Sequence, residues 1–79
     1  MSDANTILRE VKLERGRQDE KWGGPSHDDA HTVGDWARFI GQRVNELHSI
    51  PSAQRQRELL IEVAALAIAA TEALDRLKP

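Results

Sequence analysis

Two histidines and two aspartates lie within five residues in the first half of this chain. The segment around them reads Lys21-Trp22-Gly23-Gly24-Pro25-Ser26-His27-Asp28-Asp29-Ala30-His31. Neutral imidazole and carboxylate groups are ligands that Zn, Mn and Fe accept, so the segment is a candidate metal site. The alternative is structural: an aspartate caps a turn, His31 hydrogen-bonds to the backbone, and the acidic pair is solvated. Because the spacing is not that of an established metal motif, the structural role is the simpler interpretation.

A second set of candidate ligands is acidic and lies on predicted helices. Glu58 and Glu62 stand four residues apart and share one helical face, and Glu46 lies in the preceding helix. Mg²⁺ usually takes one or two protein carboxylates beside substrate phosphates, so these glutamates are the expected Mg²⁺ site, with Mn²⁺ as a substitute. Such an ion would polarise the phosphorus that water attacks. The alternative, which spacing alone favours, is that Glu58 lies beside Arg55 and Arg57 and that Glu62 pairs with an arginine.

Basic and aromatic side chains near the histidine segment are suited to an anionic ligand. Arginine is well shaped for bidentate contact with phosphate, and Trp22 can stack on a base, whereas Trp36 is expected in the core. The candidate nucleotide-binding residues are Arg17, Lys21, Trp22, His27, Asp28 and His31. The charged members are equally compatible with a solvated surface.

Helices must position these groups. The first is expected to begin after Ser2 or Asp3 and to fade near Gly23-Gly24-Pro25, the second to begin after Thr32 and end at Ile50-Pro51, and the third to begin after Ser52 and end about Lys78. Thr32 and Asp35 have the form of a capping box. The histidine segment is expected to be a loop between the first two helices. The pattern predicts an all-α, three-helix domain with two shorter helices and a long apolar C-terminal helix.

The expected C-terminal helix is apolar on nearly every side over residues 59–70. A helix on the surface of a small domain keeps a polar back, so a second cover is needed here. A symmetric homodimer, in which two such helices pack together, is the interpretation we favour. The alternative is a central helix covered by its own chain.

Composition limits the class of protein. The chain has 79 residues, which is the size of one domain, and residues 1–79 are taken as such. It has no cysteine, so disulfides and thiolate sites are excluded. A formal charge of -2 gives no attraction to nucleic acid or to an anionic membrane, and neither is an expected partner. The polar N-terminal residues do not resemble a signal peptide, and a cytoplasmic location is expected.

Two phrases of the sequence resemble a known family. They are Glu14-Arg15-Gly16-Arg17-Gln18-Asp19-Glu20-Lys21-Trp22-Gly23-Gly24 and Leu60-Ile61-Glu62-Val63-Ala64-Ala65-Leu66-Ala67-Ile68-Ala69-Ala70. Both are similar to small phage and prophage proteins related to the MazG-like all-α nucleotide pyrophosphohydrolases. The resemblance covers most of residues 7–76. It implies a helical homodimer that binds nucleoside triphosphates and hydrolyses them to monophosphate and pyrophosphate with Mg²⁺ on helix-borne carboxylates.

The acidic motifs of that family are incomplete in this chain. Where the family places Glu-Glu-x-x-Glu, the chain reads Gln42-Arg43-Val44-Asn45-Glu46 and keeps only the last acid. The family's Glu-x-x-Asp corresponds to Leu59-Leu60-Ile61-Glu62, which keeps the last acid, with Glu58 as a substitute for the first. Hydrolysis is therefore left open. The alternative is a catalytically inactive phage module, an inhibitor or regulator of a host protein, that binds its partner through residues 22–32.

Overall fold

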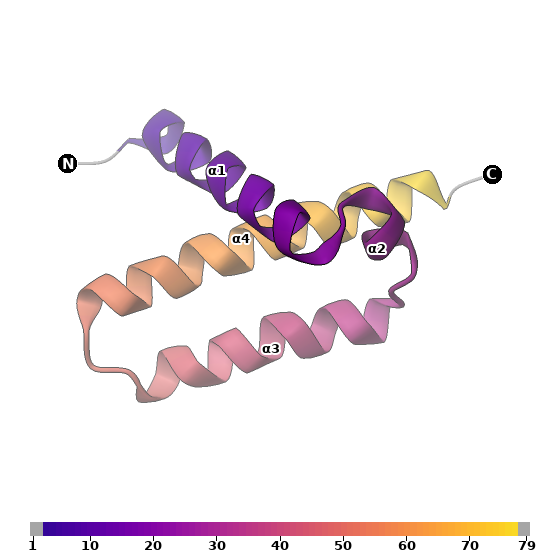
Figure 1. Ribbon diagram of the computed structural model, residues 1–79. Helices are drawn as coiled ribbons and strands as arrows, with labels where there is room; N and C mark the ends of the chain where they lie inside the picture. The colour runs from indigo at the N-terminus through magenta and orange to yellow at the C-terminus, as the bar shows by residue number, and fades with distance from the viewer. Residues whose placement is uncertain (1–2, 78–79) are drawn as a thin grey trace.

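Four helices make up residues 3–77, the part of the chain that the computed structural model describes (Figure 1). They are α1 (Ala4–Trp22), α2 (Pro25–Asp29), α3 (Val33–Ser49) and α4 (Ala53–Arg76). No strand occurs within the described residues. The predicted all-α class is confirmed. The expected number of helices is corrected from three to four.

The ends of α1 follow from local hydrogen bonding. Asp3 is the N-cap, and its carboxylate accepts from the backbone N–H of Thr6 at 2.9 Å. Gly23 ends the helix in the left-handed region, with a φ of 99°, and donates its N–H to the carbonyl of Asp19. Glycine adopts that conformation without steric cost. The alternative cap, Ser2, lies outside the described residues.

The predicted caps of the later helices are confirmed. Thr32 and Asp35 form the capping box at the start of α3, because each side chain accepts from the other's backbone N–H. The hydrogen bond from the Thr32 N–H is the main reason that the pKa of Asp35 lies below its usual value. Ser52 caps α4 by accepting from the N–H of Arg55. The expected end near Lys78 lies outside the described residues.

The prediction of a loop between the first two helices is wrong for the central part of that segment, which forms α2. Gly24 is its N-cap with a φ of 70°, and Pro25 is the first helical residue. Proline is favoured there because its fixed φ suits a helix and its missing N–H would have no intrahelical partner. The carboxylate of Asp29 accepts from Arg76 at 2.7 Å, which fastens α2 to the end of α4. Tertiary contact therefore stabilises a turn that is too short to persist alone.

The helix α4 is the centre of the fold, since α1, α2 and α3 all pack against it. Figure 1 shows α3 running alongside α4 while α1 crosses it at a wide angle and α2 lies over its C-terminal half. One cluster of buried side chains joins Trp36 of α3 to Leu66, Ala69 and Ala73 of α4. The prediction that Trp36 belongs to the core is confirmed, because it is only 5% exposed.

The opposite face of α4 stays open to solvent in the single chain. It carries large apolar side chains, with Leu60 at 54% and Leu74 at 44% exposed, and Ala67 between them is also exposed. The neighbouring helices thus cover one side of α4 and leave this stripe without cover. Within the described residues, no helix is both long and apolar enough to cross a membrane.

Candidate functional site

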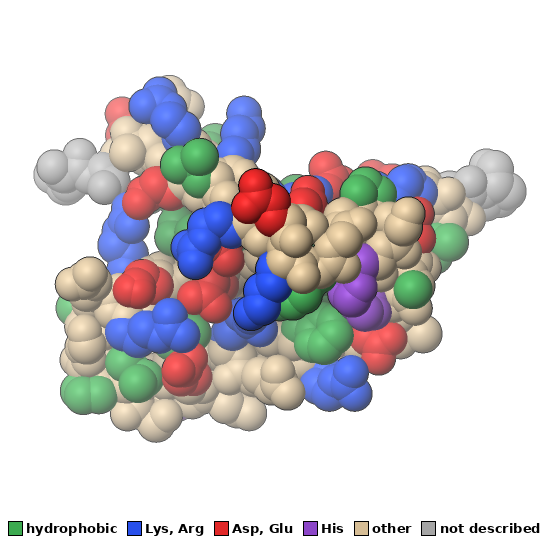
Figure 2. All heavy atoms as spheres, in the orientation of Figure 1, with side chains coloured by type: hydrophobic (Ala, Val, Ile, Leu, Met, Phe, Trp, Pro, Cys, Tyr) green, Lys and Arg blue, Asp and Glu red, His purple; other side chains and the backbone are tan. Residues whose placement is uncertain are grey.

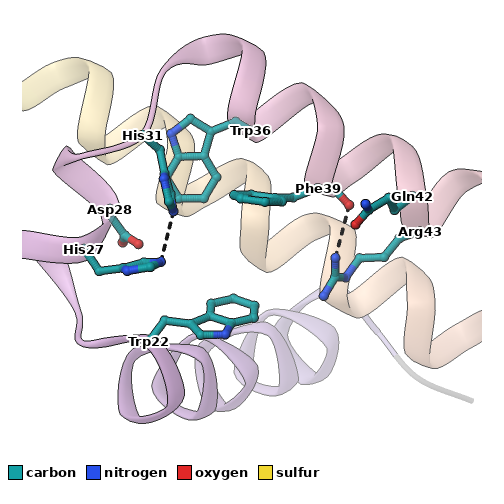
Figure 3. A pocket seen from close by; sticks show the side chains of 8 residues that line it. All are labelled: Trp22, His27, Asp28, His31, Trp36, Phe39, Gln42 and Arg43. Carbon is teal, nitrogen blue, oxygen red and sulfur yellow. Dashed lines mark hydrogen bonds between the residues drawn. The ribbon is translucent and has the colours of Figure 1, made fainter.

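A cavity of about 360 Å³ opens where α1, α2 and α3 meet. It is lined by Trp22, His27, Asp28, His31, Trp36, Phe39, Gln42 and Arg43. Figure 3 shows the indole of Trp22 across the cavity from the ring of Phe39, with the histidines at one end and Arg43 at the other. Pockets of roughly 300–1,000 Å³ lined by aromatic side chains with a few polar groups are typical of small-molecule sites.

The aromatic wall of the cavity is held by edge-to-face contacts. The ring of His31 lies 5.2 Å from that of Trp36 and 5.1 Å from that of Phe39, centroid to centroid. Trp36 and Phe39 themselves meet at an interplanar angle of 90°. Such contacts stabilise aromatic pairs beyond the burial of their area. Trp22 completes the wall from α1, and its ring is stacked with that of His27.

The two histidines of the cavity face each other through the same ring atom. The Nε2 of His27 lies 3.0 Å from the Nε2 of His31, so one ring donates a hydrogen bond and the other accepts it. The alternative in which His31 hydrogen-bonds to the backbone is wrong, because its side chain is hydrogen-bonded to His27. Both histidines are partly exposed, so this end of the cavity is accessible. Histidine side chains are visible at the surface beside hydrophobic ones in Figure 2.

Asp28 is the buried acid of the site. It is 7% exposed, and its carboxylate lies 3.8 Å from the guanidinium of Arg15. Burial raises the pKa of Asp28 above its usual value, and the charge of nearby Asp19 raises it further, whereas Arg15 opposes the shift. The environment therefore disfavours the ionised form. Asp29, its neighbour in sequence, points to Arg76 instead and takes no part in the cavity.

Basic side chains lie at a smaller hollow of about 170 Å³ that shares Trp22 and Arg43 with the cavity. Its lining includes Glu14, Arg17, Gln18, Lys21, Trp22, Arg43 and Glu62. The ammonium of Lys21 lies 5.5 Å from the centre of the Trp22 ring. Arg43 is fixed by hydrogen bonds to the Phe39 carbonyl and to Glu62, each at 3.1 Å. Cations thus adjoin an aromatic cavity.

The three glutamates predicted to bind Mg²⁺ converge on an arginine. The guanidinium of Arg55 lies 3.1 Å from Glu46, 3.0 Å from Glu62 and 3.9 Å from Glu58. Glu62 also accepts from Arg43. The alternative interpretation, in which Glu62 pairs with an arginine, is confirmed.

These carboxylates do not fit Mg²⁺ as they lie. Arg55 already supplies the positive charge that a metal ion would bring to these carboxylates. A hard cation would need oxygens of the carboxylates directed at the single point that it occupies. Across residues 3–77, no group of three or more His, Asp or Glu side chains is arranged to hold a metal ion.

The structure brings most of the predicted ligand-binding residues into one place. Trp22, His27, Asp28 and His31 line the cavity, and Arg17 and Lys21 line the adjoining hollow. Four cavity residues were not among the candidate ligand-binding residues: Trp36, which was expected in the core, and Phe39, Gln42 and Arg43. The signal for the last three was their spacing after Trp36, which places all of them near one face of a helix.

The comparisons with known proteins add no relative. No family model, curated protein or solved structure matches the chain.

Replacing Asp28 by Asn should stabilise the folded protein at neutral pH. The folded-state pKa of Asp28 is raised, so ionisation penalises the folded state above that pKa, and the penalty disappears as the pH falls toward the value of the unfolded chain. Urea unfolding at pH 7 should give a higher free energy for Asp28→Asn than for the unmodified protein, and the difference should shrink near pH 4. The exposed Asp29→Asn is the matched control and should lose a little stability. If Asp28→Asn is less stable than the unmodified protein at pH 7, then the ionised Asp28 carboxylate does not destabilise the folded state, and the prediction is contradicted.

Replacing Arg55 by Gln should make the stability of the protein sensitive to Mg²⁺. The change removes the cation shared by Glu46, Glu58 and Glu62 and leaves their charges to repel one another. The melting temperature should fall by a few degrees and should recover when Mg²⁺ is added, whereas the unmodified protein should not respond. Arg57→Gln is the control, because Arg57 pairs with Glu10 on α1. If added Mg²⁺ does not change the melting temperature of Arg55→Gln, the idea that Arg55 takes the place of a metal ion among these glutamates is contradicted.

Proposed function

We propose that this protein binds a nucleotide, with the base in the aromatic cavity and the phosphate on the basic side of the adjoining hollow. The observation that carries the proposal is the pair of rings, Trp22 and Phe39, that face each other across an open space (Figure 3). A planar heterocycle inserted there has an aromatic surface on both sides. Stacking of this kind contributes about 1–3 kcal/mol per base.

Polar groups at the two ends of the cavity suit the edge of a base. The Gln42 amide has both a donor and an acceptor, which is what hydrogen bonding to a nucleobase edge requires. At the other end, His27 and His31 offer ring nitrogens. Few polar groups in an otherwise apolar cavity fix the orientation of a ligand and favour one base over another.

The charge of the hollow supports binding of a phosphate. Three basic side chains and two acidic ones line it, so a net positive charge adjoins the cavity. The side chain of Arg17 is 80% exposed, and among the described residues it pairs only with Glu14 in the same helix, so it can turn toward an anion at little cost. Lys21, whose ammonium lies 5.5 Å from the centre of the Trp22 ring, lines the hollow next to the proposed position of the base.

The proposal concerns binding and does not include hydrolysis. The sequence resemblance to MazG-like pyrophosphohydrolases supports a nucleotide as the ligand. The position of Arg55 among Glu46, Glu58 and Glu62 favours binding that needs no divalent ion. The alternative, an interaction module that presents residues 22–32 to a partner protein, has less support because α2 is packed on α4 and buries Asp28.

Nucleotide affinity should depend on Trp22 and Lys21. We expect calorimetric titration with the common ribo- and deoxyribonucleoside mono- and triphosphates to give saturable binding for at least one base, equally in Mg²⁺ and in EDTA. Trp22→Leu should weaken this binding about tenfold to hundredfold, because one stacking partner is lost. Lys21→Gln should weaken the binding of the nucleotide and leave the binding of the matching free nucleoside unchanged.

Lys12→Gln is the matched control for Lys21→Gln, since both lysines are exposed on α1 and only Lys21 lines the hollow. It should bind as the unmodified protein does. Absence of binding by every nucleotide would reject the proposal and favour the interaction module. Binding that Trp22→Leu leaves unchanged would place the ligand elsewhere.

We also propose that two copies of the chain associate through the open face of α4. Leu60, Ala64, Ala67, Thr71 and Leu74 recur at alternating intervals of four and three residues along that face. This spacing suits packing of one helix against another, and small residues in the middle allow close approach. An antiparallel copy related by a two-fold axis at Ala67 places Leu60 of one chain opposite Leu74 of the other. The face is therefore complementary to itself, as a symmetric dimer requires.

The mass in solution tests the dimer. Light scattering should give the mass of two chains for the unmodified protein, and Ala67→Glu should give the mass of one, because it places two carboxylates at the axis. The side chain of Ala67 is exposed in the single chain, so its helix content should not change. Leu13→Glu, on an exposed position of α1, is the control and should remain dimeric. A single-chain mass for the unmodified protein at all concentrations would refute the dimer.

A further inference from the structure

We propose that His27 and His31 form a binding site for a divalent transition-metal ion such as Zn²⁺ or Ni²⁺. The site is at one end of the cavity and does not depend on the nucleotide. It also differs from the expected Mg²⁺ site, which involves only carboxylates on α3 and α4. The proposal rests on how the two imidazoles are placed and on the carboxylates around them.

The two Nε2 atoms are already at the separation that a shared metal ion needs. Nitrogens bound at neighbouring positions of one ion, each at about 2.0–2.1 Å, lie about 2.8–3.4 Å apart. The observed distance between the Nε2 atoms of His27 and His31 is 3.0 Å. Their ring planes are nearly perpendicular, at 86°, and the ring centroids are 4.5 Å apart. An ion bound to both atoms would lie to one side of the line that joins them, so the rings must turn toward that point but need not move apart.

The spacing of the residues has a structural cause. His27 belongs to α2, and His31 follows four positions later, after the helix has ended. Residues four apart on a helical turn project to one side, which is how two histidines bind one metal in helical zinc motifs. His31 is held from behind by its contacts with Trp36 and Phe39, so the pair is preorganised.

A carboxylate near His31 favours the tautomer of that ring that binds metal through Nε2. The Nδ1 of His31 lies 3.9 Å from the Asp35 carboxylate, which favours a proton on Nδ1 and leaves the lone pair on Nε2. When metal binds, the hydrogen between the two Nε2 atoms moves to Nδ1 of its own ring, so the neutral pair releases no net proton.

The chemistry of the donors selects the class of ion. Imidazole nitrogen suits Zn²⁺, Ni²⁺ and Cu²⁺, whereas Mg²⁺ prefers oxygen. The chain has no cysteine to compete for such ions, and its third histidine, His48, lies at the other end of α3. Two protein ligands leave the remaining coordination positions to water or to a ligand in the cavity.

Titration with the metal alone tests the site. Calorimetry with Zn²⁺, and separately with Ni²⁺, should show one ion bound per chain by the unmodified protein, with no nucleotide present. His27→Ala and His31→Gln should each lower the affinity at least about tenfold. His48→Ala is the matched control and should bind like the unmodified protein. Mg²⁺ should give no heat at this site.

A second measurement on the unmodified chain does not depend on whether the variants fold. Imidazole ¹⁵N spectra should show the Nε2 resonances of His27 and His31 shifting together on addition of Zn²⁺, with His48 unchanged. The proposal is overturned if Zn²⁺ and Ni²⁺ do not bind at one ion per chain, or if the His48 resonance shifts instead. Because no nucleotide is present, either outcome is independent of the nucleotide proposal.

Discussion

The close packing of α4 against the other helices is the constraint on which the rest of the structure depends. Small buried side chains, Ala69 and Ala73, together with Leu66, form the surface on which Trp36 lies. Trp22 and Phe39 then pack on the edge of this cluster and remain partly exposed to the cavity. The aromatic side chains of the candidate site therefore form a layer that is continuous with the core through Trp36. A substitution that moves Trp36 would alter both.

Acidic side chains lie in different environments at the cavity and between α3 and α4. At the cavity, Asp28 is buried and has a raised pKa, and the aromatic rings dominate. Beyond the end of the cavity that Arg43 forms, Arg55 and Arg43 neutralise the acidic side chains between α3 and α4. The acidic positions that resemble a metal centre in sequence thus hold a structural ion-pair network. The acidic network therefore lies apart from the aromatic and imidazole rings that line the cavity.

Helix ends could be predicted from sequence because they depend on residues only a few positions apart. The capping box of Thr32 and Asp35 is the clearest case. The segment that forms α2 was missed because contacts with α4, such as that between Asp29 and Arg76, stabilise it. Trp22 and the histidines were identified as a group by their proximity in sequence. Phe39 and Gln42 were not identified as site residues. Their face of α3 lines a cavity only because of the distance between α1 and α3, which tertiary packing sets.

The central claim is that the cavity receives a planar ring between Trp22 and Phe39, and the most direct test is to observe that contact. Intermolecular nuclear Overhauser effects, measured for the protein with the nucleotide that it binds best, report which protons of protein and base are neighbours. The account predicts effects from the base protons to both the Trp22 indole and the Phe39 ring. Effects confined to other surfaces, with neither ring involved, would contradict it.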